Sequence, residues 1–179
     1  MRLAAIAYEA GLPIDDFLWR VAERLRAQGV VLAGALQENV GGGLPGECAA
    51  MQLVELTSHR RVGISQDLGA QSKGCRLDAR GLSEIGALLD RPFASGTELL
   101  MLNRFGKAEA ESGGGLRSVF ARAIEAGVPI LTAVRPPYIE AWAAFHDGLA
   151  VALAPDVHAV LAWCNEAVAE RRTALAPAQ

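Results

Sequence analysis

The fold of this chain is decided by one stretch of sequence, Leu99-Leu100-Met101-Leu102-Asn103-Arg104-Phe105-Gly106-Lys107-Ala108-Glu109. Its first four residues form an apolar run, typical of a buried strand, and polar and charged side chains follow at once. In open α/β sheets, ligands bind at the edge where the parallel strands end. The stretch therefore predicts a parallel strand and a binding site, with Asn103, Lys107 and Glu109 as candidate ligand-binding residues.

The N-terminal part has the same strand and loop order. Leu3–Ala7 is a short apolar strand, and residues 14–28 carry apolar side chains at helical spacing. Gly29 ends this helix, since glycine readily takes the left-handed conformation found after helices. Residues 30–36 form a second strand, so the chain opens as an α/β fold.

The loop after the first strand lacks the residues of a phosphate-binding P-loop. Such a loop has the form GxxxxGK[ST], whose lysine and hydroxyl contact the phosphates and the magnesium ion. The loop here reads Tyr8-Glu9-Ala10-Gly11-Leu12-Pro13-Ile14-Asp15-Asp16, a degenerate Walker A with one glycine, no lysine and no hydroxyl. Two interpretations stay open: Gly11 and the free N–H groups of the helix hold a small anion, or Asp15 and Asp16 cap the helix.

The rest of the chain continues the alternation of strands and helices. The pattern predicts strands at 98–102, 129–134 and 149–153, and helices at 79–89, 115–126, 138–145 and 156–171. Right-handed crossovers make such strands parallel, so we expect a three-layer α/β fold with a mostly parallel sheet. An irregular hairpin insertion, at about 41–75, interrupts it with paired segments 51–56 and 61–65. We predict one domain, 1–171, and a flexible tail, 172–179.

Composition excludes several classes of protein. With 179 residues, 51% of them hydrophobic, and a net charge of -3, the chain suits one domain and has no basic face for nucleic acid. No apolar run is long enough for membrane insertion, and the first residues do not resemble a signal peptide. Three cysteines without tight spacing do not form a disulfide framework, which favours a cytoplasmic location.

Further candidate ligands lie in the insertion and after a later strand. Cys48 and Cys75 fall in the two loops of the insertion, and Asp78 follows Cys75 closely. Thiolates with a carboxylate suit a soft metal, whereas ordinary thiols packed under loops explain them equally well. Arg135 follows the strand 129–134. There it either donates paired hydrogen bonds to an oxyanion or is a surface charge.

Several segments resemble a known family. They are residues 29–37, 66–69, Gly74-Cys75-Arg76-Leu77-Asp78, 103–109 and 127–134, followed by Trp142, Phe145 and Trp163-Cys164. They are similar to a bacterial family of unknown function, related to small P-loop nucleoside-triphosphatases but lacking the P-loop and often linked to molybdenum-transport genes. Residues 103–109 resemble the Asp-Glu-x-Gly-Lys-x-Glu motif of those triphosphatases, with Asn103-Arg104 in place of Asp-Glu. The resemblance implies a P-loop-NTPase-like fold, and molybdate or a nucleotide as ligand.

Three functions follow from these observations. The first is a cytoplasmic protein that binds a small anion, a molybdate-like oxyanion or a nucleotide, without efficient hydrolysis. The second is a nucleoside-triphosphatase or other phosphate-handling enzyme, with Glu109 or Asp78 as general base and Lys107 as electrophile. The third is a protein-interaction module with a vestigial cleft. The partner is then either a second copy of the chain, forming a homo-oligomer, or a molybdenum-handling protein. We expect one cavity to hold the predicted residues and the 8–14 loop: Cys75, Asp78, Asn103, Lys107 and Arg135.

Overall fold

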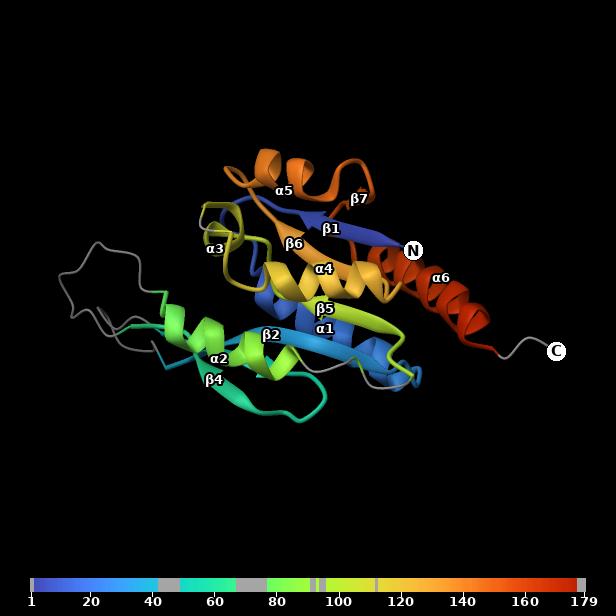
Figure 1. Cartoon of the computed structure of the whole chain (residues 1–179), viewed down its shortest axis with the longest axis horizontal. Coiled ribbons are helices and arrows are strands. Elements are labelled where there is room, and N and C mark those ends of the chain that lie inside the picture. Colours follow the sequence, from blue (N-terminus) through green and yellow to red (C-terminus); the bar gives the residue numbers. More distant parts are fainter. Residues whose placement is uncertain are drawn as a thin grey trace.

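The computed structural model describes residues 2–41, 49–66, 77–90, 93, 96–111 and 113–176. Seven strands form one sheet in the order β4-β3-β2-β5-β6-β1-β7 (Figure 1). The strands are β1 (Leu3–Ala7), β2 (Leu32–Val40), β3 (Ala50–Glu55), β4 (Arg61–Gly63), β5 (Leu99–Leu102), β6 (Ile130–Val134) and β7 (Ala150–Leu153). The helices are α1 (Ile14–Ala27), α2 (Ala79–Leu89), α3 (Lys107–Glu111), α4 (Arg117–Glu125), α5 (Ile139–His146) and α6 (Val157–Leu175).

The helices cover both faces of this sheet. Figure 1 shows α2 and α4 in front of the strands and α1 behind them. Side chains of α1 and α6 pack on one face of the sheet, and those of α2, α4 and α5 pack on the other. In β5, Leu99 and Met101 enter the first core while Leu100 and Leu102 enter the second, because successive side chains of a strand point to opposite faces. The prediction of a three-layer fold is confirmed.

Parallel pairing brings the ends of the central strands to one edge. β2, β5, β6, β1 and β7 pair in parallel, whereas β3 and β4 are antiparallel additions at the β2 side. The sheet is thus mostly parallel, as predicted. The C-terminal ends of β1, β5 and β6 consequently meet at the same edge, and this positions the candidate site.

The hairpin predicted as part of an insertion belongs to the main sheet. β3 pairs with β2 from Ala35 opposite Glu55 to Val40 opposite Ala50. This pairing carries β2 beyond Leu36, where the sequence predicted its end, because polar residues 37–39 gain ladder hydrogen bonds from the antiparallel neighbour. Most of the segments predicted to be irregular, 42–48 and 67–76, lie outside the described residues.

Helix α1 forms where its apolar residues predict it. Phe17, Leu18 and Val21 are buried on one side, and the acidic first turn and basic last turn complement the helix dipole. However, Pro13 occupies the N-cap position and no side chain caps the helix. The interpretation of Asp15 and Asp16 as capping residues is therefore wrong, because both lie inside the first turn.

Helices α3 and α6 differ most from the sequence prediction. Helix α3 was not predicted, since its five residues, Lys107–Glu111, are too few to show helical periodicity. Helix α6 continues to Leu175, four residues beyond the predicted end at Arg171.

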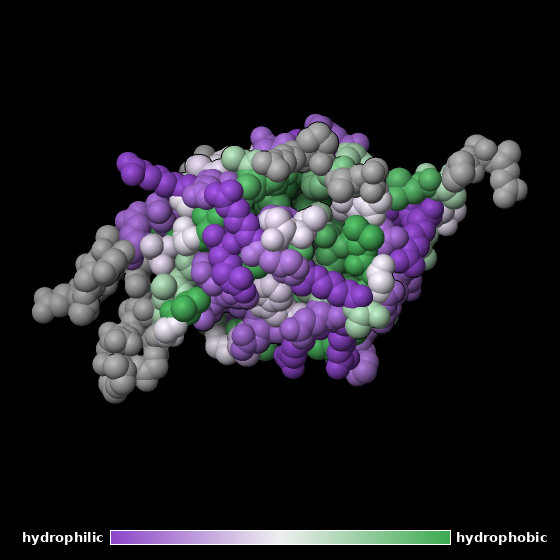
Figure 2. Space-filling view, turned by 90° about the horizontal axis from the view of Figure 1, so that it is seen from below, coloured by the Kyte–Doolittle hydropathy of each residue, from purple (hydrophilic) through white to green (hydrophobic). Residues whose placement is uncertain are grey.

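The surface is predominantly polar on the face seen in Figure 2, with small hydrophobic areas between charged side chains. Large apolar residues with about half of their surface exposed include Val31, Val40, Leu149 and Val151. Within the described segments, no helix has both the length and the apolar character that crossing a membrane requires.

A buried carboxylate near the start of β5 leads to a prediction about acid stability. Glu98 accepts hydrogen bonds from Arg172, at 2.5 and 3.0 Å, and from the backbone N–H of Val31 at 2.9 Å. The bonds from Arg172 lower the pKa of Glu98 below its ordinary value of 4.5. This contact therefore stabilises the fold at pH values above the ordinary pKa, and the stabilisation is lost as the pH falls through the lowered pKa.

We expect Glu98→Gln to reduce the free energy of unfolding at neutral pH, and the difference from the wild type to shrink on acidification. Urea denaturation at a series of pH values measures this difference. The matched control is Glu23→Gln, at an exposed position of α1, which should leave the pH profile unchanged. A Glu98→Gln difference that grows as the pH falls would contradict the assignment.

Candidate functional site

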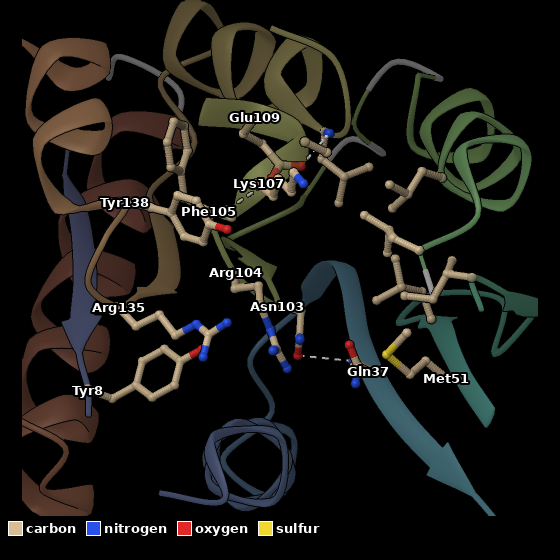
Figure 3. A pocket seen from close by; sticks show the side chains of 17 residues that line it. Tyr8, Gln37, Met51, Asn103, Arg104, Phe105, Lys107, Glu109, Arg135 and Tyr138 are labelled. Carbon is tan, nitrogen blue, oxygen red and sulfur yellow. Dashed lines mark hydrogen bonds between the residues drawn. The ribbon is translucent and has the colours of Figure 1, made fainter. Parts of the chain in front are cut away.

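A cavity of about 240 Å³ opens at the C-terminal edge of the parallel strands (Figure 3). Its polar lining consists of Tyr8, Gln37, Asn103, Arg104, Lys107, Glu109, Arg135 and Tyr138. Its apolar lining consists of Met51, Leu53, Ile64, Leu77, Leu82, Phe105 and Leu116, with Gly106 and Ala108 between the two sets. Residues from Tyr8 to Tyr138, far apart in the sequence, therefore meet in one space.

Strand ends position the polar side chains. Tyr8 follows β1, Asn103 follows β5 and Arg135 follows β6. The backbone is fixed there by hydrogen bonds from Tyr8 N–H to the Val134 carbonyl (3.1 Å) and from Asn103 N–H to the Ala35 carbonyl (3.0 Å). The side chains thus project from a rigid edge, as binding sites on open α/β sheets do.

Glu109 is the one carboxylate in the described lining, and it is bound by the backbone. Its two oxygens accept hydrogen bonds from the N–H groups of Gly106 and Leu116, each at 2.9 Å. Gly115 makes room for this arrangement, because a Cβ atom there would lie 2.1 Å from the Glu109 Oε1 atom. Each carboxylate oxygen therefore accepts one backbone hydrogen bond, and the side chain holds the loop between α3 and α4.

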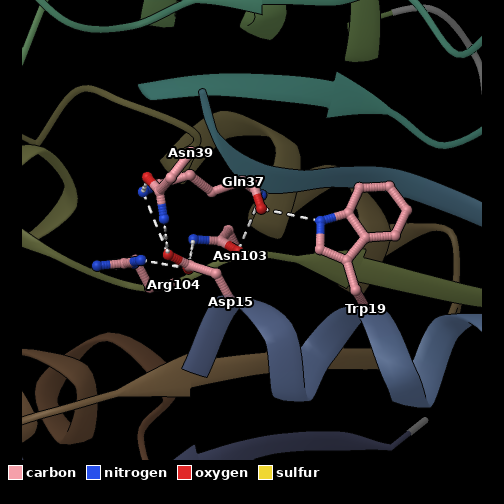
Figure 4. Close-up of polar contacts among 6 residues, drawn as sticks. All are labelled: Asp15, Trp19, Gln37, Asn39, Asn103 and Arg104. Carbon is pink, nitrogen blue, oxygen red and sulfur yellow. Dashed lines mark hydrogen bonds and ion pairs between the residues drawn. The ribbon is translucent and has the colours of Figure 1, made fainter. Parts of the chain in front are cut away.

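Asp15 joins α1 to the ends of β2 and β5 through a polar network (Figure 4). Its Oδ1 accepts from Asn103 Nδ2 at 3.0 Å and from the Arg104 guanidinium, and its Oδ2 accepts from Gln37 and Asn39, each at 3.2 Å. Its side chain is only 15% exposed, against 33% for Arg104. Both polar atoms of the Asn103 amide have a partner, since its Oδ1 also accepts from the Gln37 N–H at 3.0 Å.

Two buried polar atoms of the lining residues have no hydrogen-bond partner in the described part of the chain. They are the hydroxyl oxygen of Tyr8, a residue only 6% exposed, and the Nε atom of Arg104. Leaving a buried donor without a partner costs about 1–3 kcal/mol. Figure 3 shows the Tyr8 hydroxyl and the Arg135 guanidinium both directed into the pocket. A bound acceptor group would satisfy these donors.

The predicted site residues fall into two groups. Asn103, Lys107, Glu109 and Arg135 line the cavity together. By contrast, Asp78 caps α2 by accepting from the Arg80 N–H at 3.0 Å, and Gly11 is exposed; neither is part of the described lining.

The proposed cysteine ligands, Cys48 and Cys75, lie outside the described residues. Among the residues that the structure does describe, no three His, Cys, Asp or Glu side chains are grouped so that they could hold a metal ion. Cys164 lies buried on α6, where burial raises the pKa of its thiol to about 12. This thiol is therefore protonated and belongs to the core.

Sequence reasoning singled out neither Gln37, Arg104 nor Tyr138, and it placed Tyr8 in the cavity only as part of the 8–14 loop. A signal was present for the three that were missed. Gln37 comes directly after the predicted strand 30–36, Arg104 comes directly after Asn103, and Tyr138 lies three residues after Arg135. The apolar lining from β3 and α2 had no such signal, because its sequence pattern is typical of residues in a hydrophobic core.

A mostly parallel sheet with helices on both faces, and a cavity at its C-terminal edge, places this chain in the three-layer α/β class that includes the P-loop nucleoside-triphosphatases. The solution structure of a human cancer-related nucleoside triphosphatase has this fold. It superposes with a TM-score of 0.65 over 97% of this chain and 98% of that one, at 16% sequence identity. Within this class, the chain belongs to the family described as protein of unknown function DUF2478, whose model matches residues 3–163.

The chain is also similar to a protein whose name states an activity. The molybdenum import ATP-binding protein ModC 2 of Bradyrhizobium diazoefficiens is 36% identical over 165 residues. The match covers 92% of this chain but only 18% of the length of that relative. The similarity thus links this whole fold to one segment of a much longer protein.

Proposed function

We propose that this chain is a cytoplasmic ligand-binding protein that holds a small anion without hydrolysing it efficiently. The observation that carries the proposal is the charge of the cavity. Arg104, Lys107 and Arg135 converge on it, while its one described carboxylate, Glu109, is bound by two backbone N–H groups. Cationic side chains in a partly buried cleft favour anionic ligands.

Arg135 and Lys107 are the cations best placed to bind. In the described part of the chain Arg135 makes no ion pair, whereas Arg104 is paired with Asp15. Lys107 approaches Glu111 at 3.8 Å, but both side chains are more than half exposed and such surface pairs are weak. A planar guanidinium, an ammonium and the Tyr8 hydroxyl together offer the donors that an oxyanion accepts.

The loop from Tyr8 to Asp15 supports binding without hydrolysis. Between these two residues it has no lysine, serine or threonine. In a working P-loop, a lysine contacts the phosphates and a hydroxyl binds magnesium, together with a carboxylate beyond a neighbouring strand. Here the carboxylate of Asp15, at the start of α1, pairs with Arg104 beyond β5.

The contacts of the acidic residues support a binding protein over an enzyme. Glu109 holds the loop between α3 and α4 through two backbone N–H groups, and Asp78 caps α2 outside the described lining, so both carboxylates have structural roles. Molybdate and nucleotides remain the ligands that we propose. Molybdate is favoured by the name of the relative from Bradyrhizobium diazoefficiens, and a molybdenum-handling protein is the corresponding partner.

We expect purified protein to show no magnesium-dependent turnover of ATP or GTP above background in a phosphate-release assay. The reason is the missing lysine and hydroxyl of the loop, and the pairing of Asp15 with Arg104. Turnover at an ordinary rate of about 1 per second, abolished by Lys107→Ala, would contradict this prediction and support the enzyme alternative.

We expect Arg135→Ala and Lys107→Ala each to weaken anion binding by about 1–3 kcal/mol, the usual contribution of a charge-assisted hydrogen bond. Both should lie at the low end, since both residues are exposed and Lys107 has 52% of its side chain accessible. Titration calorimetry with molybdate, inorganic phosphate, ATP and GTP measures these changes. Arg80→Ala is the matched control, because Arg80 is exposed on α2 and outside the described lining.

The same titrations separate this proposal from a protein-interaction module. If none of the anions binds to the wild-type protein, the cleft is vestigial and the interaction module is favoured. Binding that survives both Arg135→Ala and Lys107→Ala would place the anion elsewhere on the molecule.

A further inference from the structure

The cavity has two chemically different ends. Figure 3 shows Tyr8, Arg104 and Arg135 on one side of it and Lys107 beside Glu109, whereas most of the remaining lining is apolar. Figure 3 shows Met51 on the opposite side of the pocket from Tyr8 and Arg135. A bare oxyanion needs only the cationic end and would leave the apolar end filled with water.

The apolar end lies on the face of the sheet away from α1. Leu53, Ile64 and Leu116 belong to the core under α2, α4 and α5, whereas the buried face of α1 packs in the other core. A triphosphate held by a P-loop would sit on the loop that leads into α1. The body of this cavity is therefore separate from that position, and it suits a different part of a ligand.

The size of the cavity is consistent with a compact organic molecule. Pockets for drug-sized ligands have volumes of about 300–1,000 Å³, and they are mostly apolar with a few polar groups that fix orientation. At about 240 Å³ this cavity is slightly smaller, so it suits one ring system with a small charged group. Lys107, Arg135 and the buried Tyr8 hydroxyl, which has no partner in the described part of the chain, offer donors that suit a group with three terminal oxygens.

We propose that the ligand is a phosphate monoester of a ring compound. This inference rests on the proposed function and names the class of anion. The phosphate is bound by Arg135, Lys107 and the Tyr8 hydroxyl, and the ring lies against Leu53, Ile64 and Leu82. Burial of an aromatic ring adds affinity that inorganic phosphate cannot gain, because the transfer of apolar surface from water is favourable.

The test compares phenyl phosphate, methyl phosphate and inorganic phosphate by titration calorimetry on the full chain. The three share a phosphate group and differ in apolar surface. We expect phenyl phosphate to bind at least tenfold more tightly than inorganic phosphate, with methyl phosphate between them. Equal affinities, or weaker binding of phenyl phosphate, would overturn the ring proposal while leaving the anion site intact.

A pair of variants locates the ring. Leu82→Phe fills the apolar end without changing its charge, and should reduce the affinity for phenyl phosphate at least fivefold while leaving that for inorganic phosphate unchanged. Leu88→Phe makes the same substitution on α2, at a partly buried position outside the described lining, and should change neither affinity. Equal effects of both variants, or none from Leu82→Phe, would place the ring elsewhere.

The two proposals fail in different ways. If no phosphate compound binds, the anion-binding function itself is wrong. If inorganic phosphate binds and depends on Arg135 but phenyl phosphate gains nothing, only the ring proposal is wrong. Retained binding of inorganic phosphate by Leu82→Phe also shows that this variant is folded.

Discussion

Asp15→Ala is expected to lower the free energy of unfolding by about 3 kcal/mol. The carboxylate accepts hydrogen bonds from Arg104 and Asn103 across the sheet edge, and from Gln37 and Asn39 of β2. Removing one partner of a buried ion pair costs about 3–5 kcal/mol, because the other charge is left without compensation. The lower figure applies here, since the Arg104 side chain is 33% exposed.

Urea denaturation measures this loss, and Asp16→Ala is the matched control. Asp16 is the next residue of the same helical turn but is exposed, so its removal should cost less than about 1 kcal/mol, the size of a helix-dipole contribution. Phosphate should stabilise Asp15→Ala more than the wild type, because Arg104 is then free to bind it. Equal losses from the two substitutions would show that the network contributes no specific stability.

Gly34→Ala is expected to lower the free energy of unfolding by about 4 kcal/mol or more. Gly34 lies in β2 with φ at +114°, a conformation that costs other residues about 1–3 kcal/mol. Its added Cβ would also lie 1.9 Å from the carbonyl oxygen of Met101 in β5, which pairs with Gly34. Backbone atoms cannot rotate away from such a contact, so the two central strands would have to separate.

The control for this prediction is Gly63→Ala in β4. A Cβ atom at Gly63 meets nothing within 4 Å, and its φ is not in the left-handed region. We therefore expect no loss, or a small gain from the reduced entropy of the unfolded chain. Thermal and urea unfolding of both variants gives the comparison, and a Gly34→Ala variant as stable as Gly63→Ala would contradict the close approach of β2 and β5.

The sequence by itself determined the fold class and the edge that carries the site. Apolar runs such as Leu99–Leu102 and the helical spacing in α1 are local patterns, and local patterns decide which segments become strands or helices. Once the strands are taken as parallel, their C-terminal ends must share an edge. Asn103, Lys107 and Arg135 were therefore predicted to lie together, and all three line the cavity.

Only the tertiary structure decided the chemistry of that cavity. The pairing of Asp15 with Arg104 joins residues 89 positions apart, and neither residue signals the other in the sequence. The same holds for β3 and α2, whose apolar side chains form the wall opposite the charged end. Side chains meet across such distances through packing of the whole chain, which no local pattern encodes. Packing also left the Tyr8 hydroxyl buried without a partner in the described residues. It placed Asp78 at the N-cap of α2 and not in the cavity lining.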